Sequence, residues 1–204
     1  MKRSLFIFLA AIIVACGCNP LYPDVTKKGN YWVCFPKECE TVTVDPIQNG
    51  MLVVVDGHRC SPDSAIEKQI FDYWNLESTG EGWKKGLIWY HKEVCTGFSI
   101  TASEKWFGRE SGEDLSGFFS ISKPGDELYG KWYLLFSAEK RLLCDMPDHM
   151  PLKDYVALKP IMLPMLYLEI NDTGKEDFKG ELTVTVTITF DGGKVLSGLA
   201  KLNR

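Results

Sequence analysis

The clearest hydrophobic pattern of the chain lies near its C-terminus, in residues 182–190. Every even-numbered position there is apolar and every odd-numbered one is threonine. Because side chains alternate between the two faces of a strand, this pattern predicts a strand with one face on a core and the other in solvent. Residues 191–194, Asp-Gly-Gly-Lys, predict a turn, and residues 195–202 predict the hairpin partner. Residues 167–170 precede the pair as a third expected strand.

Shorter apolar, β-branched or aromatic runs predict strands over much of the remaining chain. These expected strands are residues 31–34, 40–44, 51–55, 87–90, 98–102, 118–122 and 132–137. Asn49-Gly50 predicts a hairpin turn before the third of them, because both central positions of a type I′ turn need a positive φ. Residues 123–126, Lys-Pro-Gly-Asp, predict a turn that joins the last two as a strand pair.

One segment has helical spacing. Ser61 is placed to cap free backbone amides and Pro62 to occupy the first helical position, so we expect one short amphipathic helix over residues 62–75. The apolar residues that recur at helical spacing are Ile66, Ile70, Phe71 and Trp74. Residues 104–117 predict a loop or a helical turn. Residues 145–164 are rich in proline, which predicts an irregular connection with an edge strand at most.

Many short strands, frequent turn signals and a single good helix indicate a mainly β fold. We expect an antiparallel β-sandwich of the immunoglobulin-like, Greek-key kind, formed by residues 30–204 as one domain. The short helix is expected to pack over one end or edge of the sandwich. A doubly wound α/β fold is disfavoured because helices do not alternate with strands along the chain.

The N-terminal segment predicts export. Two basic residues precede an almost unbroken apolar run over residues 5–14, which is too short to span a bilayer as a permanent helix. The Ile-Val-Ala-Cys ending of this segment resembles the lipobox of bacterial lipoproteins. That resemblance implies that residues 1–15 are a signal peptide cut before Cys16, whose sulfur then carries a diacylglycerol.

Two alternatives stay open at this end of the chain. The signal can be cleaved with no lipid attached, and Cys18, which follows a small glycine, can be the modified residue in place of Cys16. Parity favours Cys16, because six cysteines then remain and can pair completely: Cys18, Cys34, Cys39, Cys60, Cys95 and Cys144. Since an exported chain meets an oxidising compartment, we expect disulfides among them. A local bridge between Cys34 and Cys39 is one candidate, and the connectivity is otherwise open.

Residues 16–29 contain two prolines and few apolar residues, which predicts a tether between membrane and domain. The lipobox, the tether and a sandwich that ends in a Thr/Val-rich hairpin together resemble the small lipoproteins of Bacteroidetes bacteria. This resemblance implies a cell-envelope protein held by its lipid on the outer membrane, with its periplasmic and surface faces both open. It implies no catalytic residue.

Aromatic residues supply the candidate ligand-binding positions, which are Trp83, Trp106, Trp132 and Tyr90. Aromatic faces stack on the apolar faces of sugar rings and on peptides, and packing in the core is the alternative. Trp83 and Trp106 lie in expected loops, so we expect them to be exposed. In the adjacent pair Trp89-Tyr90, strand geometry turns one residue outward. The expected partners besides the membrane are therefore a glycan or an envelope protein.

Other chemistry is not favoured. The net charge of −4 is mild and well mixed, and the sequence has neither a basic stripe nor a basic tail. This argues against binding to a nucleic acid. No metal or other cofactor is expected, because zinc sites usually combine close Cys or His pairs, whereas His58, His91 and His149 are scattered. No Gly-x-Ser-x-Gly elbow occurs, and the acidic residues around His149 lack a catalytic spacing.

We therefore expect a non-enzymatic, lipid-anchored binding or accessory module of the cell envelope. The signal, the strand pattern and the lack of a catalytic constellation support this expectation. A structural component of a surface appendage or an export complex is the first alternative, and a polysaccharide hydrolase is the second.

Overall fold

The structure is a computed structural model that describes residues 32–77, 86–122, 134–145, 149–171 and 180–203. The expected signal peptide and tether lie outside these ranges, and so do Cys16, Cys18, Trp83 and Trp132. Within the ranges the protein is mainly β, with several antiparallel sheets and two short α-helices. The fold class predicted from the hydrophobic pattern is therefore confirmed.

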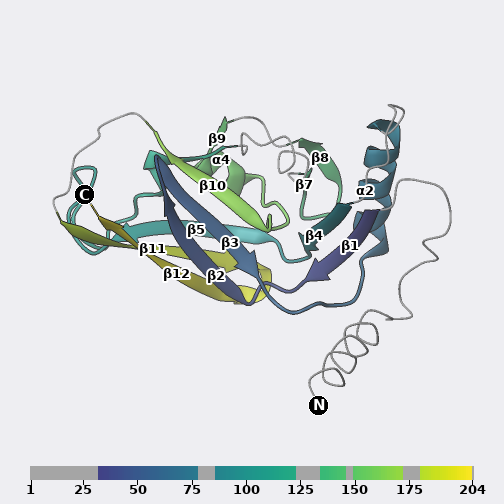
Figure 1. The fold of residues 1–204 in the computed structure, drawn as a ribbon, viewed down its shortest axis with the longest axis horizontal. Helices are drawn as coiled ribbons and strands as arrows, with labels where there is room; N and C mark the ends of the chain where they lie inside the picture. The colour runs from purple at the N-terminus through teal and green to yellow at the C-terminus, as the bar shows by residue number, and fades with distance from the viewer. Residues whose placement is uncertain (1–31, 78–85, 123–133, 146–148, 172–179, 204) are drawn as a thin grey trace, which may run out of the picture.

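The larger lobe is formed by two antiparallel sheets (Figure 1). One contains, in spatial order, β2 (Thr41–Ile47), β3 (Gly50–Asp56), β10 (Met165–Ile170), β6 (Phe119–Ser122) and β9 (His149–Pro151). The other contains β12 (Val195–Asn203), β11 (Glu181–Phe190) and β5 (Cys95–Ala102). The sheets meet where β12 packs against β2. A Cβ built on Gly198 would lie 2.6 Å from the carbonyl oxygen of Val42, so only glycine permits this approach.

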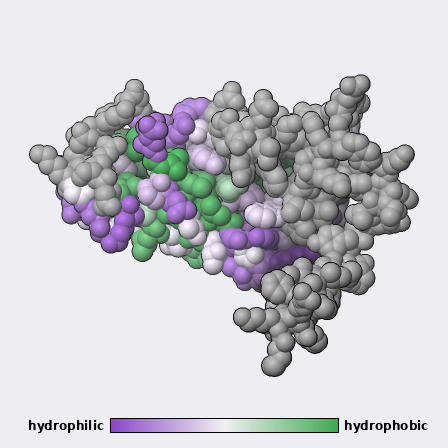
Figure 2. All heavy atoms as spheres, viewed as in Figure 1, coloured by the Kyte–Doolittle hydropathy of each residue, from purple (hydrophilic) through white to green (hydrophobic). Residues whose placement is uncertain are grey.

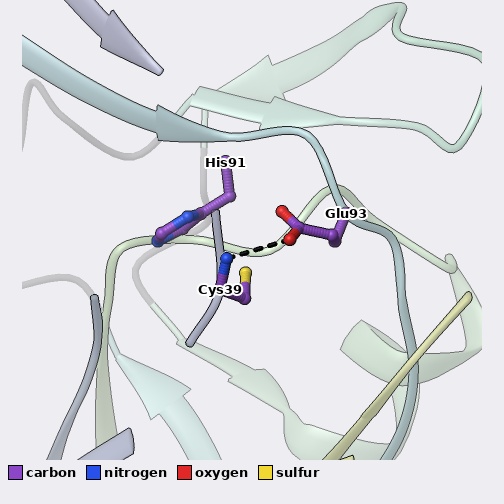
Figure 3. Close-up of side chains that lie close together, drawn as sticks. All are labelled: Cys39, His91 and Glu93. Atoms are coloured by element: carbon purple, nitrogen blue, oxygen red, sulfur yellow. Dashed lines mark hydrogen bonds between the residues drawn. The ribbon is translucent and has the colours of Figure 1, made fainter. Parts of the chain in front are cut away.

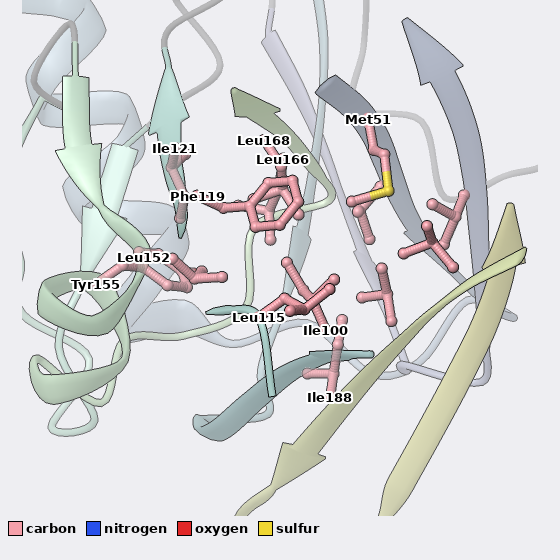
Figure 4. Close-up of a cluster of buried hydrophobic side chains, with 14 of the residues drawn as sticks. Met51, Ile100, Leu115, Phe119, Ile121, Leu152, Tyr155, Leu166, Leu168 and Ile188 are labelled. Atoms are coloured by element: carbon pink, nitrogen blue, oxygen red, sulfur yellow. The ribbon is translucent and has the colours of Figure 1, made fainter. Parts of the chain in front are cut away.

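Side chains from both sheets meet those of α4 (Leu152–Ala157) in one core (Figure 4). The largest fully buried members are Met51, Ile100, Leu115, Phe119, Ile121, Leu135, Leu152, Tyr155 and Phe190. Leu152 and Tyr155 are three positions apart, so α4 directs both to the same side. This helix lies inside the region expected to be irregular. Its six residues are too few to show a helical hydrophobic pattern in the sequence.

Burial along β11 alternates at every position, with the apolar residues buried and the threonines between them partly exposed. The predicted strand, its turn and its hairpin partner β12 are thus confirmed. Gly192 and Gly193 have φ angles of 77° and 82° in the turn, values that favour glycine. The expected strand over residues 167–170 is confirmed as β10, but it does not join this hairpin: β5 is the other neighbour of β11, and β10 pairs with β3 and β6. The alternation fixes which face of a strand is buried but does not identify its neighbours.

The smaller lobe lies beside the first (right in Figure 1). Its elements are the parallel pair β1 (Trp32–Lys37) and β4 (Gly86–His91), the helix α2 (Ser64–Glu77), and the antiparallel pair β7 (Leu134–Phe136) and β8 (Leu142–Asp145). A second core joins them through Cys34, Ile66, Ile70, Tyr90, Leu134, Phe136 and Ile161. The expected pairing of residues 118–122 with 132–137 is wrong, because β6 lies between β10 and β9 while β7 pairs with β8.

The described strands form four sheets in all. An immunoglobulin-like Greek key within this arrangement stays a prediction.

The hairpin between β2 and β3 forms one residue earlier than expected. Ile47 pairs with Gly50, so Gln48 and Asn49 are the two turn residues. Gly50 lies in β3 itself, where a Cβ would be 1.8 Å from the carbonyl oxygen of Leu168 in β10. The lack of a side chain at Gly50 therefore serves the packing of two strands, not the turn.

Asp63 caps the N-terminus of α2, so the expectation that Ser61 does so is wrong. The Oδ1 atom of Asp63 accepts hydrogen bonds from the backbone N–H groups of Ala65 (3.1 Å) and Ile66 (3.3 Å). Its Oδ2 atom lies 2.6 Å from the Nζ atom of Lys140, a residue of the connection between β7 and β8. One carboxylate thus completes the first turn of α2 and ties the helix to the neighbouring strand pair.

Replacing Asp63 with alanine should lower the free energy of unfolding by about 1 kcal/mol near neutral pH. The Lys140 hydrogen bond and the two backbone amides, against an opposing effect of burial, hold the pKa of Asp63 below its usual value. Its contribution is therefore present above the ordinary Asp pKa and is lost as the pH falls through the lowered folded-state pKa. Urea unfolding at neutral pH and in strong acid measures this. Ser61→Ala is the control, and an equal loss from it would contradict the assignment of the cap.

Candidate functional site

The chain brings a group of ionisable side chains together where the two lobes join. Since β1 and β4 are parallel and Lys37 pairs with His91, the carboxyl ends of these strands lie side by side. Cys39 follows β1, and Glu93 follows β4. Lys194, just after the turn between β11 and β12, reaches Glu93 from the larger lobe. The site is therefore built from three connections that are remote from one another in the sequence.

Cys39, His91 and Glu93 each offer one ligand atom to this site, and these atoms all lie within 4.8 Å of one another. Figure 3 shows the three side chains close together, with the Glu93 carboxylate turned toward Cys39. Cys39 is 0% exposed and His91 is 1% exposed. The side chains of both are therefore removed from bulk water, whereas Glu93 is partly exposed.

The two oxygens of Glu93 have different surroundings. Oε1 accepts hydrogen bonds from the Cys39 backbone N–H (2.9 Å) and from Lys194 Nζ (3.1 Å). Oε2 is buried and has no hydrogen-bond partner in the described part of the chain. Burial by itself would raise the pKa of Glu93, but the Cys39 N–H and the Lys194 ammonium hold it below its usual value. Glu93 is thus a fixed carboxylate that leaves one oxygen free.

Cys39 is a protonated thiol in this setting. Burial and, after it, the nearby negative charge of Glu93 raise the pKa of Cys39 above its ordinary value. Because the thiolate and not the thiol is the nucleophile, the Cys39 sulfur is a poor attacking group as it stands. A cation close to it would reverse this preference.

His91 lies against two backbone carbonyls. Its Nδ1 atom is 2.9 Å from the oxygen of Lys37 and its Nε2 atom is 3.1 Å from the oxygen of Val55. Burial lowers the pKa of His91, which favours the neutral ring. A neutral imidazole has one N–H, so it donates to only one of the two carbonyls and keeps a lone pair on the other nitrogen.

A second cluster lies on the outer side of the same connection. The exposed side chains of Glu38, Glu40 and His58 also offer ligand atoms within 4.8 Å of one another. His58 Nδ1 is 2.6 Å from Glu40 and its Nε2 is 3.8 Å from Glu38. Successive residues after β1 thus alternate, with the two glutamates directed outward and Cys39 inward.

The aromatic candidates lie differently from what the sequence predicts. Trp106 is only 4% exposed and its ring stacks on Phe107 at 4.4 Å, so the expectation that it is an exposed contact is wrong. Tyr90 is buried too, and its hydroxyl donates to Glu67 at 2.9 Å. Trp89, its neighbour in β4, is the outward member of the pair at 44% exposure, with Lys37 Nζ 4.4 Å above its ring. Of Trp89 and Trp106, Trp89 is therefore the one available to a ligand.

Cys34, Cys39, Cys60 and Cys95 are free thiols, so the expectation of disulfides between them, including the Cys34–Cys39 bridge, is wrong. Cys34 belongs to the smaller core, whereas Cys39 and Cys95 belong to the larger one. The side chain of Cys144 is not among those described. Cysteines behave as small hydrophobic residues in such positions, which accounts for their burial without a bridge.

Thiol labelling should separate these cysteines. Burial, with the charge of Glu67 adding to it, raises the pKa of Cys34 to about 12. Burial raises the pKa of Cys95 to about 12 and also raises that of Cys39. In the native protein Cys60, which is partly exposed, should react first with a maleimide, and the other three only after unfolding. Peptide mapping checks this, and bridged peptides among the four in unreduced protein would contradict it.

Other sequence candidates do not meet. Asp154 is exposed on α4, and His149 lies 3.9 Å from Glu169 in a loose pair. The side chains of Asp145 and Asp148 lie outside the described part. No helix among the described residues is long and apolar enough to cross a membrane.

Comparisons with protein-family models, with curated proteins and with solved structures return no match to this chain.

Sequence reasoning missed the cluster of Cys39, His91 and Glu93 because Cys39 comes from a different part of the chain than His91 and Glu93. Cys39 and Glu93 are 54 positions apart, and neither lies within a Cys-x-x-Cys pair of the kind that marks a zinc site. The available signal was that two expected strands are each followed by a metal-ligating residue. Apolar runs do not reveal that two such strands pair in parallel, which is what brings their ends together.

Proposed function

We propose that the protein is an exported lipoprotein, anchored through Cys16, that acts as a non-enzymatic binding or accessory module of the cell envelope. The observation that carries this proposal is the basic, apolar and Ile-Val-Ala-Cys succession over residues 1–16, which precedes a mainly β domain. Two or more acyl chains make membrane attachment stable, so a lipidated Cys16 would hold the domain at the membrane.

A band of apolar side chains on the larger lobe supports a binding role. Leu52, Val54 and Met165 alternate with the buried residues of β3 and β10 and are partly exposed. They are adjacent in register, with Val54 opposite Met165 and Leu52 opposite Tyr167. Figure 2 shows hydrophobic residues gathered over these two strands, with hydrophilic residues around them. Contiguous apolar surface with a polar rim is typical of protein interaction sites.

Trp89 gives the smaller lobe a second candidate binding position, of a different kind. Its exposed ring can stack on a sugar, and Lys37 beside it supplies a hydrogen-bond donor. The two positions therefore favour different partners, since the band suits a protein surface and the ring suits a glycan.

Membrane anchoring is tested by fractionating cells that express the full chain and by mass spectrometry of its N-terminal peptide. Acylated Cys16 is expected, and Cys16→Ser should release the protein from the membrane. Cys18→Ser is the matched control and should stay anchored. An unmodified Cys16 in protein recovered from the cytosol would refute the proposal.

Binding is tested by probing glycan arrays and envelope-protein arrays with the anchored protein in detergent. Leu52→Lys should abolish protein binding, and Trp89→Ala should abolish glycan binding. Thr185→Lys, on the outer face of the other sheet, is the control for an added surface charge. Co-purification of a stable envelope assembly without array binding would favour the structural alternative. Binding that none of the variants changes would remove both surfaces from consideration.

A further inference from the structure

We propose that Cys39, His91 and Glu93 form a binding site for Zn²⁺ at the junction of the two lobes. The three side chains provide a sulfur, a nitrogen and an oxygen ligand within 4.8 Å of one another. In a tetrahedral zinc site, metal–ligand bonds of about 2.0 to 2.3 Å separate the ligand atoms by about 3.5 Å. Metal binding therefore requires the three side chains to draw closer together, by rotation of the His91 ring among other movements.

The free oxygen of Glu93 is the observation that points to a cation. A buried carboxylate oxygen without a partner is costly, and here Oε2 has none in the described part of the chain. The other oxygen is already held by the Cys39 N–H and by Lys194. Metal-binding carboxylates are commonly oriented by such hydrogen bonds on the oxygen that does not bind. Zn²⁺ on Oε2 would satisfy the unpartnered atom and leave both existing bonds intact.

His91 can supply a nitrogen ligand in its neutral form. One ring nitrogen can donate its N–H to a backbone carbonyl, of Lys37 or of Val55, while the metal takes the lone pair of the other nitrogen. Metal-binding histidines usually have a carbonyl or carboxylate on the second nitrogen. Because each ring nitrogen faces a carbonyl oxygen, at 2.9 or 3.1 Å, the ring must turn, or the carbonyl to which it does not donate must move aside, before a metal can reach the lone pair.

The ligand set favours Zn²⁺ over other divalent cations. Thiolate and imidazole together suit zinc, whereas Mg²⁺ and Ca²⁺ require oxygen ligands. On binding, the S–H bond of Cys39 breaks, its proton passes to water, and the sulfur electron pair forms the metal–sulfur bond. One proton is therefore released for each Zn²⁺ bound, and the affinity should rise with pH. Three protein ligands leave one tetrahedral position for water.

The site would connect the lobes. Cys39 leads into β2 and Glu93 leads into β5, so both lead into the larger lobe, while His91 ends a strand of the smaller one. A ligand that binds only the folded state stabilises it, so bound Zn²⁺ should raise the melting temperature of the full chain. This inference does not rest on the lipid anchor, and either proposal can fail without the other.

The experiment is a Co²⁺ titration of the full chain, purified in detergent and stripped of metal with a chelator. One equivalent of Co²⁺ should produce a thiolate-to-cobalt charge-transfer band that Zn²⁺ removes by displacement. Cys39→Ser should lose the band. Glu93→Gln keeps an oxygen for the Cys39 N–H but replaces Oε2 by an amide nitrogen. Glu93→Gln and His91→Gln should each weaken metal binding. Removing an outer hydrogen-bond partner of a metal ligand already costs roughly 10- to 100-fold in affinity, so the loss of a ligand should cost at least as much.

His58→Gln is the matched control, because it disables the exposed cluster with Glu38 and Glu40 while leaving the buried one intact. It should keep both the band and the affinity. Circular dichroism of each metal-free variant establishes that it folds. If His91→Gln unfolds, Cys39→Ser and Glu93→Gln still test whether this site binds the metal. The proposal is overturned by the absence of a band, by a band that persists in Cys39→Ser, or by a loss confined to His58→Gln.

Discussion

Replacing Phe119 with alanine should lower the free energy of unfolding by about 3 to 5 kcal/mol, as is usual when a buried phenylalanine is truncated. Phe119 in β6 is 1% exposed and belongs to the core of the larger lobe. Its ring meets Trp106 edge-on at 6.0 Å and Phe107 at 6.1 Å. Truncation removes these contacts and leaves a cavity among side chains that come from both sheets and from α4.

Phe118 offers a matched control. It is the adjacent residue, of the same type, and it stacks on Phe107 at 4.7 Å, but it is only partly buried. Phe118→Ala should therefore cost clearly less than Phe119→Ala, because water replaces part of what the ring contacted. Urea unfolding followed by tryptophan fluorescence measures both. Equal losses from the two variants would show that Phe119 does not occupy the centre of this core.

The sequence predicted best where local pattern and tertiary structure coincide. The alternation in β11 requires one buried face, and the two glycines after it allow a tight reversal, so strand, turn and partner all follow from neighbouring residues. The helix α2 follows in the same way from Ile66 and Ile70, which are both buried. Even there the cap is Asp63 rather than Ser61, because α2 begins at Ser64, and Asp63 also pairs with Lys140, which is remote in sequence.

Prediction failed wherever the outcome depended on strand order. The runs that form β6 and β10 were recognised, but β6 was given the wrong neighbour and the partners of β10 were not identified. A short apolar strand in an antiparallel sheet can pair with any other, since its sequence specifies a buried face and not an edge. The prediction of which aromatic side chains are exposed was wrong for a similar reason, because it too depended on long-range contacts. Trp106 was assigned to an exposed loop, yet that loop folds back so that its ring packs on Phe107 and Phe119.

The candidate site depends on strand order most of all. Cys39 and His91 are neighbours only because β1 and β4 are parallel and adjacent, with two antiparallel strands and a helix between them in the chain. Lys194 reaches Glu93 only because the turn between β11 and β12 lies beside that junction. Residue spacing places His91 near Glu93 but gives no sign of Cys39 or Lys194, which is why it argued against a metal site. The same geometry sets the surroundings of the free cysteine at the junction: the backbone N–H of Cys39 donates to the Glu93 carboxylate, and its side chain is fully buried.

Replacing Gly50 with alanine should lower the free energy of unfolding by about 3 kcal/mol, the upper end of the usual cost of overpacking. The added methyl group would lie 1.8 Å from the carbonyl oxygen of Leu168 and 2.9 Å from its carbonyl carbon. Both atoms belong to the backbone of β10, so no side chain can rotate away and β3 must separate locally from its neighbour. That ladder carries the apolar band over Leu52 and Val54, so Gly50→Ala should also weaken partner binding at this band.

Gly117→Ala separates this clash from the general effect of removing a glycine. Nothing lies within 4 Å of a Cβ at Gly117, and its φ is not in the left-handed region. Replacement there should be neutral or stabilise the protein by up to about 1 kcal/mol, since alanine restricts the unfolded chain. Thermal and urea unfolding of the two variants provide the comparison. A Gly50→Ala protein as stable as Gly117→Ala would mean that β3 and β10 are not in the contact described, and the apolar band would have no structural basis.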